Sequence, residues 1–529
     1  MDNGRRNAIG LLGGLALSGL GGCCIPPQLR RDNIETYNGP VPPLLVTSGL
    51  TRGMEVLPAR AIDVHAHFFN ASDIDAAGYL AHSVGHSTLE LQGFIIAMEP
   101  VVRAVTEIAS SAKEEYELLI DANTRTDGRS MKSLENRMTQ QRQRIEKRLQ
   151  EEIVSRGVDI EYDKAQVSLE RKWGARFIPR RFNSTTVHKI VDEMHSPGVR
   201  GGRDQLRGVS GSTPDGIIRF VACMLQDRWM NLDLYRRTWE PMGIAAAFGA
   251  MVNFDYRYCA SRSTPHDQML LMALISKMSG GYMLPLIAYN PMTDLKESGA
   301  SLALVQEAVN HHGFIGVKIY PPMGFQPYGS GAELDRLLLK MFKWCAEQKV
   351  PVMAHANRSM GYDNEADNAS SPAGWQALAD AMAPGLPMRV NLGHLGGDGS
   401  EGDPTSWTRD FAQLMSQPKG TNTYGDLGYW TGLRACIDAT CEPLERIKDA
   451  LNVFPDFGRH VMYGSDWFMM IKEDGWQDYP TELARALAFS NLDRQAVFRT
   501  NAIECFGLND KTRLNNLIEH LGKLPSWLT

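Results

Sequence analysis

Short apolar runs alternate with helix-like stretches from residue 61 towards the C-terminus. The runs are nearly continuous in hydrophobic residues, which is typical of parallel strands covered on both faces. We expect eight strands: Ile62–His67, Ala245–Phe254, Tyr282–Tyr289, Phe314–Tyr320, Pro351–Ala356, Arg389–His394, Thr423–Tyr429 and His460–Asp466. Lys318 and His355 are 37 residues apart, and His355 and His394 are 39 apart. Eight β-loop-α units of this size predict an α/β fold, the (β/α)8 TIM barrel.

The first connection between strands is much longer than the others. The chain runs 251 residues from His67 to Lys318, where three barrel units need roughly 110. The excess, at about 71–241, contains a charged helix-like run at Ser133–Ser155 and a helix with an apolar face at Ile217–Trp239. We predict a large, mainly helical insertion after strand 1, at the end of the barrel where active sites form. Two roles stay open for it: a lid or pocket wall, and a solvated or oligomer-contacting projection.

The N-terminal residues have the pattern of an export signal. A basic pair, Arg5-Arg6, precedes the uncharged, small and apolar stretch Ala8–Gly22, which predicts a signal peptide over 1–22. The run ending in Cys23 resembles a bacterial lipobox, so membrane contact is expected only through a lipid anchor on that cysteine. Residues 23–60 are interpreted as a tether and N-terminal extension before the barrel at 61–529. We expect an exported protein, periplasmic or membrane-anchored, and the use of the twin-arginine route stays open.

Composition narrows the class of protein. The 529 residues include 55 Lys and Arg against 61 Asp and Glu, with 43% hydrophobic residues, which excludes a disordered chain and argues against a nucleic-acid partner. Eight cysteines in this length exclude a disulfide scaffold. Cys436 and Cys441 are close enough to pair in an oxidising compartment, with buried free thiols as the alternative. Oligomerisation stays open.

Polar residues stand at the ends of four predicted strands. Strand 1 ends in His65-Ala66-His67, and residues i and i+2 of a strand face the same side. His355, His394 and Asp466 each end an apolar run of another strand. Buried polar groups without partners cost several kcal/mol, and convergence on a cation removes that cost. These residues therefore predict a site for a divalent metal.

Lys318 lies inside the apolar fourth strand, in a run that continues as Ile-Tyr-Pro-Pro. A buried ammonium is unfavourable there. Reaction with CO₂ would convert the amine into a carbamate anion, which can bridge two metals. The alternative is a lysine paired with a carboxylate of the pocket or with a substrate anion.

The order of these residues resembles that of the amidohydrolase superfamily: HxH on strand 1, lysine on strand 4, histidines on strands 5 and 6, and aspartate on strand 8. The segment around Lys318 is similar to that of dihydroorotases, and Gly-Ser-Asp-Trp around Asp466 resembles the amidohydrolase-related group that includes decarboxylases and lactonases. The resemblance implies one metal on His65, His67, Lys318 and Asp466, and a second on Lys318, His355 and His394. Relatives with one metal use the equivalents of the HxH pair, His355 and Asp466. It implies Zn²⁺ most often, with Mn²⁺, Fe²⁺ or Ni²⁺ as alternatives.

This chemistry predicts a hydrolase. A divalent metal lowers the pKa of its water from 15.7 to roughly 7, Asp466 can take and return a proton, and the metal or His394 can polarise a carbonyl. We expect cleavage of an amide, lactone or other ester of a small molecule, with Tyr320 and Arg358 as substrate contacts, the latter for a carboxylate. Further candidates for that role are Asn357, Asp398, Tyr424 and Asp426. A decarboxylase with one metal and a catalytically silent envelope lipoprotein used for binding are the alternatives.

Overall fold

The computed structural model describes residues 34–37, 57–79, 105–124, 130–155, 214–258, 260–359, 361–382, 386–398, 406–420 and 422–529. The predicted signal peptide, Cys23 and most of the predicted tether lie outside these ranges. No helix within them is both long enough and apolar enough to cross a bilayer.

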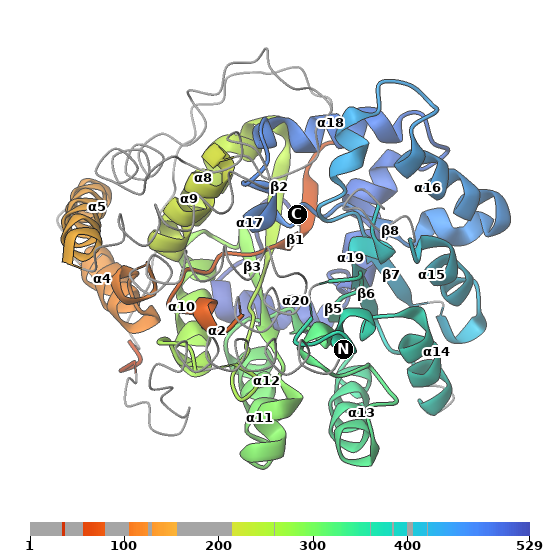
Figure 1. Cartoon of the computed structure of the whole chain (residues 1–529), viewed down its shortest axis with the longest axis horizontal. Coiled ribbons are helices and arrows are strands. Elements are labelled where there is room, and N and C mark those ends of the chain that lie inside the picture. The colour runs from red at the N-terminus through yellow and green to blue at the C-terminus, as the bar shows by residue number, and fades with distance from the viewer. Residues whose placement is uncertain are drawn as a thin grey trace, which may run out of the picture.

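Eight parallel strands form the barrel, and they pair in the order of the sequence (Figure 1). They are β1 (Ala61–Ala66), β2 (Ile244–Ala250), β3 (Met283–Ala288), β4 (Gly316–Ile319), β5 (Val352–His355), β6 (Val390–Gly393), β7 (Thr423–Asp426) and β8 (Val461–Met462). Two backbone hydrogen bonds join the last strand to the first: Val64 N–H donates to the Tyr463 carbonyl (3.1 Å) and Asp466 N–H to the His65 carbonyl (2.7 Å). The predicted (β/α)8 barrel is confirmed, with each strand inside or overlapping its predicted range.

Helices surround the strands and fill their connections (Figure 1). The α-helices are α2 (Ala76–Tyr79), α4 (Ala112–Thr124), α5 (Ser130–Ser155), α8 (Pro214–Leu225), α9 (Arg228–Trp239), α10 (Pro265–Met278), α11 (Pro291–Lys296), α12 (Ala300–His311), α13 (Ala332–Glu347), α14 (Pro372–Ala381), α15 (Thr408–Met415), α16 (Glu442–Val453), α17 (Trp467–Met470), α18 (Tyr479–Leu487), α19 (Asn501–Cys505) and α20 (Lys511–Leu521). Short helices are η3 (Glu240–Met242), η4 (Pro321–Met323), η5 (Ala366–Asn368), η6 (His394–Gly396), η7 (Pro418–Gly420), η8 (Thr431–Ala435), η9 (Pro455–Arg459), η10 (Trp476–Asp478) and η11 (Ala496–Thr500), the last a π-helix.

The C-terminal segment closes the amino-terminal end of the barrel. Arg499 donates to the carbonyl of Arg60 just before β1, and Trp527 Nε1 donates to the carbonyl of Gly281 before β3. Phe506 packs against Phe248 of β2 with ring centroids 4.7 Å apart. Because this end is filled with apolar side chains, only the carboxyl-terminal end is left for polar chemistry.

The described residues between β1 and β2 are helical, as predicted, and are tied to the barrel. The helix predicted at 217–239 is two helices, α8 and α9, because the chain breaks between them at Gln226 and Asp227. The guanidinium of Arg228 at the start of α9 is 1% exposed and pairs with Asp73 after β1 and with Glu115 of α4. A buried charge with two buried partners costs several kcal/mol when one partner is removed, so this cluster fixes α4 and α9 to the end of β1.

Cys436 and Cys441 form a disulfide bond, with Cα atoms 5.5 Å apart, which decides between the two alternatives that the sequence left open. The bond joins the residue after η8 to the residue before α16. Cys345 and Cys505 are buried free thiols, and Cys223 is buried as well.

The packing of the C-terminal helix α20 against α10 can be tested at His520. Its Nε2 lies 3.3 Å from the Ala273 carbonyl of α10, and burial lowers its pKa to about 3. The unfolded chain takes up a proton on this ring below about pH 6.5, whereas the folded chain does not. Stability should therefore fall as the pH drops from about 6.5 towards 3, by up to ~1.4 kcal/mol per pH unit for this group.

We expect His520→Gln to reduce the slope of unfolding free energy against pH in this window, measured by urea denaturation at several pH values. His311→Gln, a change at an exposed residue of α12, is the control and should keep the wild-type slope. Equal slopes in all three proteins would contradict the assignment.

Candidate metal centre

The residues predicted to bind metal come together at the carboxyl-terminal end of the barrel. Among the described residues, one group of potential ligands has its donor atoms all within 4.8 Å of one another: His65, His67 and Asp466. All three are buried, and His67 Nε2 lies 3.9 Å from the Asp466 carboxylate. Two imidazoles and a carboxylate on two neighbouring strands form a candidate site for a divalent metal.

A β-bulge aims the histidines of β1 into the barrel mouth. Between Asp63 and Ala66 the register with β2 shifts, so that three steps on β1 match two steps on β2. Bulges re-aim side chains in this way and are common beside active sites. Asp63 consequently faces outward, where it accepts a hydrogen bond from Tyr235 of α9 (2.8 Å), while His65 faces the other metal-binding candidates.

Three of the histidines are fixed in one tautomer by acceptors at Nδ1. His67 Nδ1 lies 2.7 Å from the Ala250 carbonyl, His394 Nδ1 2.9 Å from the Gly428 carbonyl, and His65 Nδ1 2.9 Å from the Asp426 carboxylate. An acceptor at Nδ1 keeps the proton on that nitrogen and leaves the lone pair on Nε2. Each ring therefore presents Nε2 as a metal ligand, and the acceptors orient the rings.

His355 and His394 extend the row of imidazoles beyond β1. Ring centroids are 4.7 Å apart between His65 and His394 and 4.5 Å apart between His394 and His355. The Nε2 atom of His355 is buried and makes no hydrogen bond. A buried polar atom without a partner is costly, and a divalent cation would satisfy it. The donor set therefore fits a divalent metal, as the sequence predicted.

The pKa values of these histidines agree with neutral ligands. Burial, followed by the charge of Lys318, lowers the pKa of His65 and His67 well below the usual range. Burial also lowers the pKa of His394 to about 4, against the opposing effect of Asp426. Neutral imidazole is the form that binds metal.

Asp426 at the end of β7 is the residue whose role the sequence did not reveal. The carboxylate is fully buried and accepts hydrogen bonds from His65 Nδ1 (2.9 Å), Asn391 Nδ2 (2.8 Å), His394 N–H (3.2 Å) and Gly428 N–H (2.9 Å). Its oxygens are occupied by protein donors, so the predicted contact with substrate is wrong for this residue. It holds the His65 ring and the backbone at His394 instead.

Glycines leave the space that the pair of His65 and Asp426 requires. A Cβ on Gly428 would lie 2.7 Å from His65 Nδ1, and one on Gly464 would lie 2.8 Å from an oxygen of Asp426. Both distances are shorter than carbon contacts allow. The Gly-Ser-Asp and Gly-Asp-Leu-Gly runs are thus needed for packing around the first metal ligand.

Lys318 of β4 is 2% exposed and lies among these groups. Burial lowers its pKa to about 8, although the charges of Asp426 and Asp466 act in the opposite direction. Burial raises the pKa of Asp466 to about 7, opposed first by the charge of Lys318. Each of these two groups therefore favours the charged form of the other.

The backbone has an unusual conformation just after β6 and β8, where the candidate ligands His394 and Asp466 stand. His394 and Leu395 have φ of 66° and 44°, and Asp466 has φ of 49°. Side chains other than glycine adopt this left-handed region at a cost that the surrounding structure must offset. For His394, Trp430 Nε1 donates to its carbonyl (2.8 Å), which holds the turn in place.

The remaining predicted contacts with substrate are divided between the two ends of the barrel. Tyr320 lies next to His355, with ring centroids 5.0 Å apart, and its hydroxyl is 3.2 Å from Ser359 Oγ. Arg358 is exposed after β5, and its guanidinium lies 5.7 Å from the Trp407 ring centroid. Tyr424 instead belongs to the apolar interior of the barrel and packs against His460, away from the metal ligands. Asn357 and Asp398 stay near the carboxyl-terminal end, where Asp398 accepts a bond from Gly432 N–H (2.7 Å).

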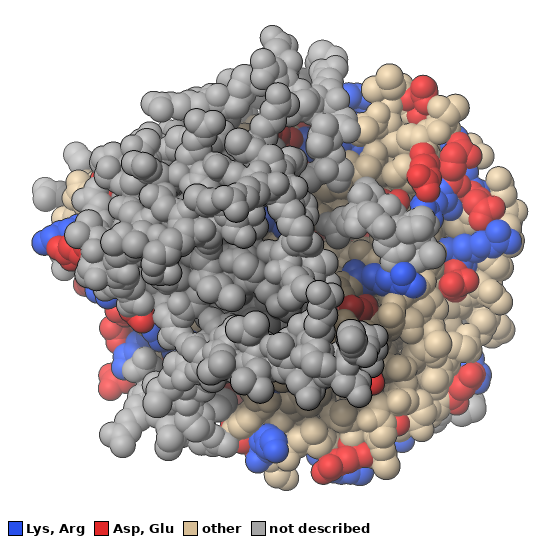
Figure 2. Space-filling view, viewed as in Figure 1, with Lys and Arg blue, Asp and Glu red and all other residues tan. Residues whose placement is uncertain are grey.

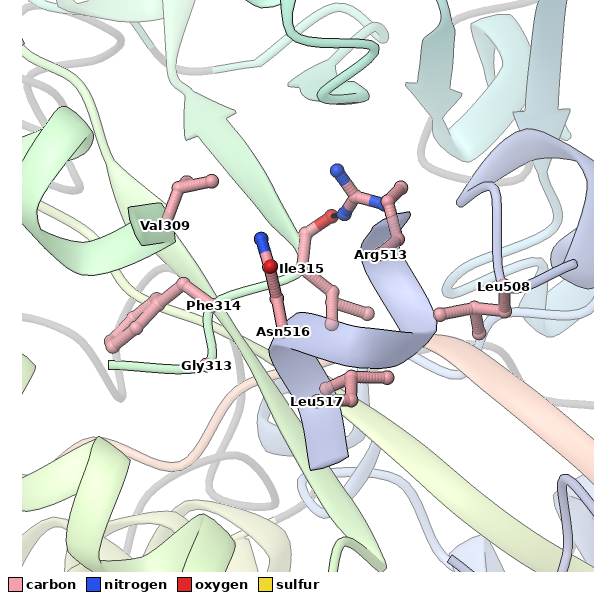
Figure 3. Close-up of a pocket in the computed structure, with 8 residues that line it drawn as sticks. All are labelled: Val309, Gly313, Phe314, Ile315, Leu508, Arg513, Asn516 and Leu517. Carbon is pink, nitrogen blue, oxygen red and sulfur yellow. Dashed lines mark hydrogen bonds between the residues drawn. The ribbon is translucent and has the colours of Figure 1, made fainter. Parts of the chain in front are cut away.

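A small cavity shown in Figure 3 lies at the opposite end of the barrel and is not this site. It is lined by residues around the start of β4 and by α20, including Ile315, Arg513 and Leu517.

On the described part of the face in Figure 2, Lys and Arg side chains are interspersed with Asp and Glu side chains and form no patch of one sign.

The fold and the site together define a (β/α)8 barrel protein with a candidate metal centre of histidines and an aspartate. The sequence profile of the family described as Amidohydrolase matches residues 281–508, a range that spans β3 to β8. This match covers less than half of the chain, and it agrees with the resemblance to the amidohydrolase superfamily that the order of the candidate ligands indicates. His65 and His67 lie before the matched range and join the site through the fold.

Comparison with solved structures finds proteins of low sequence identity. A 2,6-dihydroxybenzoate decarboxylase bound to 2,6-dihydroxybenzoate is 16% identical, covering 54% of this chain and 90% of its own, with a TM-score of 0.37. The same enzyme from Rhizobium is 16% identical, covering 57% and 94%, with a TM-score of 0.38. A 5-carboxyvanillate decarboxylase from Novosphingobium aromaticivorans with bound manganese is 14% identical, covering 63% and 94%, with a TM-score of 0.35. Curated proteins contain no sequence match to this chain.

Replacing Asp426 should weaken metal binding without removing a ligand. In Asp426→Asn the charge that keeps the proton on His65 Nδ1 is lost, and we expect the dissociation constant for Zn²⁺ to rise about 10–100-fold. Calorimetric titration of metal-free protein measures this. Asp380→Asn, at an exposed residue of α14, is the control. Equal affinities in the two variants would show that Asp426 has no part in orienting the ligand.

Proposed function

We propose that this protein is a metal-dependent hydrolase that cleaves an amide, lactone or other ester bond of a small molecule. The observation that carries the proposal is that Lys318 is buried close enough to all of the candidate donors for its charge to act on each of them. His65, His67 and Asp466 form one set, and His355 and His394 form the other. A lysine converted into a carbamate would supply oxygens to both sets, which is the arrangement expected for two metals. When bound, the metal supplies Lewis acidity and lowers the pKa of a water molecule.

The side chains of this protein have distinct roles in the proposed reaction. Asp466 faces His67 with one oxygen, 3.9 Å from Nε2, and its other oxygen can accept the proton of the attacking water and pass it to the leaving group. His394 donates Nδ1–H to Gly428, so its neutral ring offers a lone pair at Nε2. That geometry supports ligation of a metal over donation to a carbonyl, and polarisation of the carbonyl then falls to the metal.

Tyr320 and Arg358 are the proposed contacts with substrate. Tyr320 stands beside His355 at the end of β4, where its hydroxyl can donate to a polar group of the substrate. Arg358 follows β5 at the rim and can bind a carboxylate in bidentate fashion. A small anionic amide, lactone or ester fits these groups.

Turnover tests the proposal directly. Protein loaded with metal should hydrolyse some members of a panel of amides, lactones and esters that carry a carboxylate. The reaction is monitored by the acid that hydrolysis releases. Asp466→Asn should lower kcat at least 100-fold, because the proton acceptor is lost. Release of CO₂ from carboxylic acids without hydrolysis would favour the decarboxylase alternative. No turnover of either kind would favour a catalytically silent binding protein.

The metal content of Lys318→Ala separates the two enzymatic alternatives. For the hydrolase we expect two metal ions per wild-type chain and one in the variant, measured by inductively coupled plasma mass spectrometry. Lys340→Ala, at an exposed residue of α13, is the control and should keep both ions. One ion in all three proteins would support the site with one metal and the decarboxylase.

A further inference from the structure

The segment between β1 and β2 reaches the turn that carries Asp466. Helix α17 begins at the residue after Asp466, and Met470 N–H donates to the Asp466 carbonyl (2.9 Å). Ile471 N–H donates in turn to the Trp467 carbonyl (3.0 Å). A single hydrogen-bonded turn therefore connects the metal ligand to Ile471, and a shift at one end moves the other.

Arg219 of α8 binds the far end of this turn. Its side chain is 5% exposed, and Nε donates to the Ile471 carbonyl (3.1 Å) while Nη2 donates to the Glu473 carbonyl (3.1 Å) and to Asp474 (3.2 Å). Hydrogen bonds from a charged donor are stronger than those between neutral groups. The guanidinium thus joins α8 to three of the four residues that follow α17.

Two further contacts place α8 directly on the same turn, and Figure 1 shows the two helices as neighbours. A Cβ on Gly216 would lie 1.7 Å from the Lys472 carbonyl, so the first turn of α8 touches this backbone and needs a glycine there. Phe220 packs edge-on against Phe468 of α17 with centroids 5.3 Å apart. Phe468 stacks in turn on Phe69, at 4.2 Å, just after the HxH pair.

Asp466 requires such support because of its backbone conformation. Its φ of 49° lies in the left-handed region, which persists only when the surroundings determine it. Metal ligands must also be held to within about 0.5 Å of the binding geometry. The hydrogen bond of Asp466 N–H to the His65 carbonyl fixes the near end of the turn, and Arg219 fixes the far end.

We propose that Arg219 is a positioning residue for Asp466, so that α8 supports the candidate metal centre. This role is independent of which reaction the centre performs. It gives α8 a supporting role at the site, in place of the solvated projection that the sequence left open. By linkage, metal bound at Asp466 must stabilise α8 to the same extent that α8 favours metal binding.

Titration of metal-free protein with Co²⁺ tests the proposal, since visible absorption reports both affinity and ligand geometry. We expect Arg219→Gln to weaken Co²⁺ binding about tenfold and to change the intensity of the visible bands. Arg219→Lys, which keeps the charge, should restore part of the affinity. Arg262→Gln is the control, because Arg262 also donates to backbone carbonyls, those of Thr106 and Glu107, and pairs with Glu114 of α4.

Amide hydrogen exchange provides a second measurement. It is made on the wild-type protein and therefore does not require the Arg219 variants to fold. In wild-type protein, Co²⁺ should slow amide exchange in α8, and Phe220→Leu should reduce that protection. The proposal would be overturned if both Arg219 variants had the Co²⁺ affinity and the spectrum of the wild type. It would also be overturned if Co²⁺ did not change the rate of amide exchange in α8. Because no substrate is used, failure of the proposed hydrolysis would leave these results unaffected.

Discussion

The structure depends on one constraint: several imidazoles are buried together at the mouth of a barrel, and each must be neutral and correctly oriented. A buried ring needs an acceptor for its N–H and a partner for its lone pair. The protein supplies the acceptors, with the carbonyls of Ala250 and Gly428 and the carboxylate of Asp426. Among the described residues none is a partner for Nε2 of His355, and a divalent cation would complete the arrangement.

Backbone geometry around the centre follows from that constraint. The bulge in β1 turns two nearby residues in different directions. Asp63 binds Tyr235 of α9, and His65 points into the carboxyl-terminal end of the barrel. Left-handed residues at the ends of β6 and β8 turn His394 and Asp466 towards the same point. These features cost conformational energy, and the hydrogen bonds of Trp430 and Arg219 show how nearby helices offset it.

Several of these features could be predicted from the sequence because they depend on local pattern. Continuous apolar runs identify strands buried on both faces, and their spacing identifies the barrel unit. The HxH pair was identifiable since residues i and i+2 of a strand share a face. Asp426 was one of several candidates for contact with substrate, because it lies near the end of a strand. Its bonds to His65 and His394 join residues 361 and 32 positions away, and no local pattern shows such a partnership.

The sequence by itself determined the class of fold and the residues that stand at the ends of β1, β5, β6 and β8. These depend on residue types and spacings within single units of the chain. Only the tertiary structure decided which carboxylate faces the ligands and which one orients them. It also decided that α8 binds the turn after Asp466. The physical reason is that burial, hydrogen-bond partners and backbone strain are set by neighbours far away in sequence, whose distances exist only after the barrel closes.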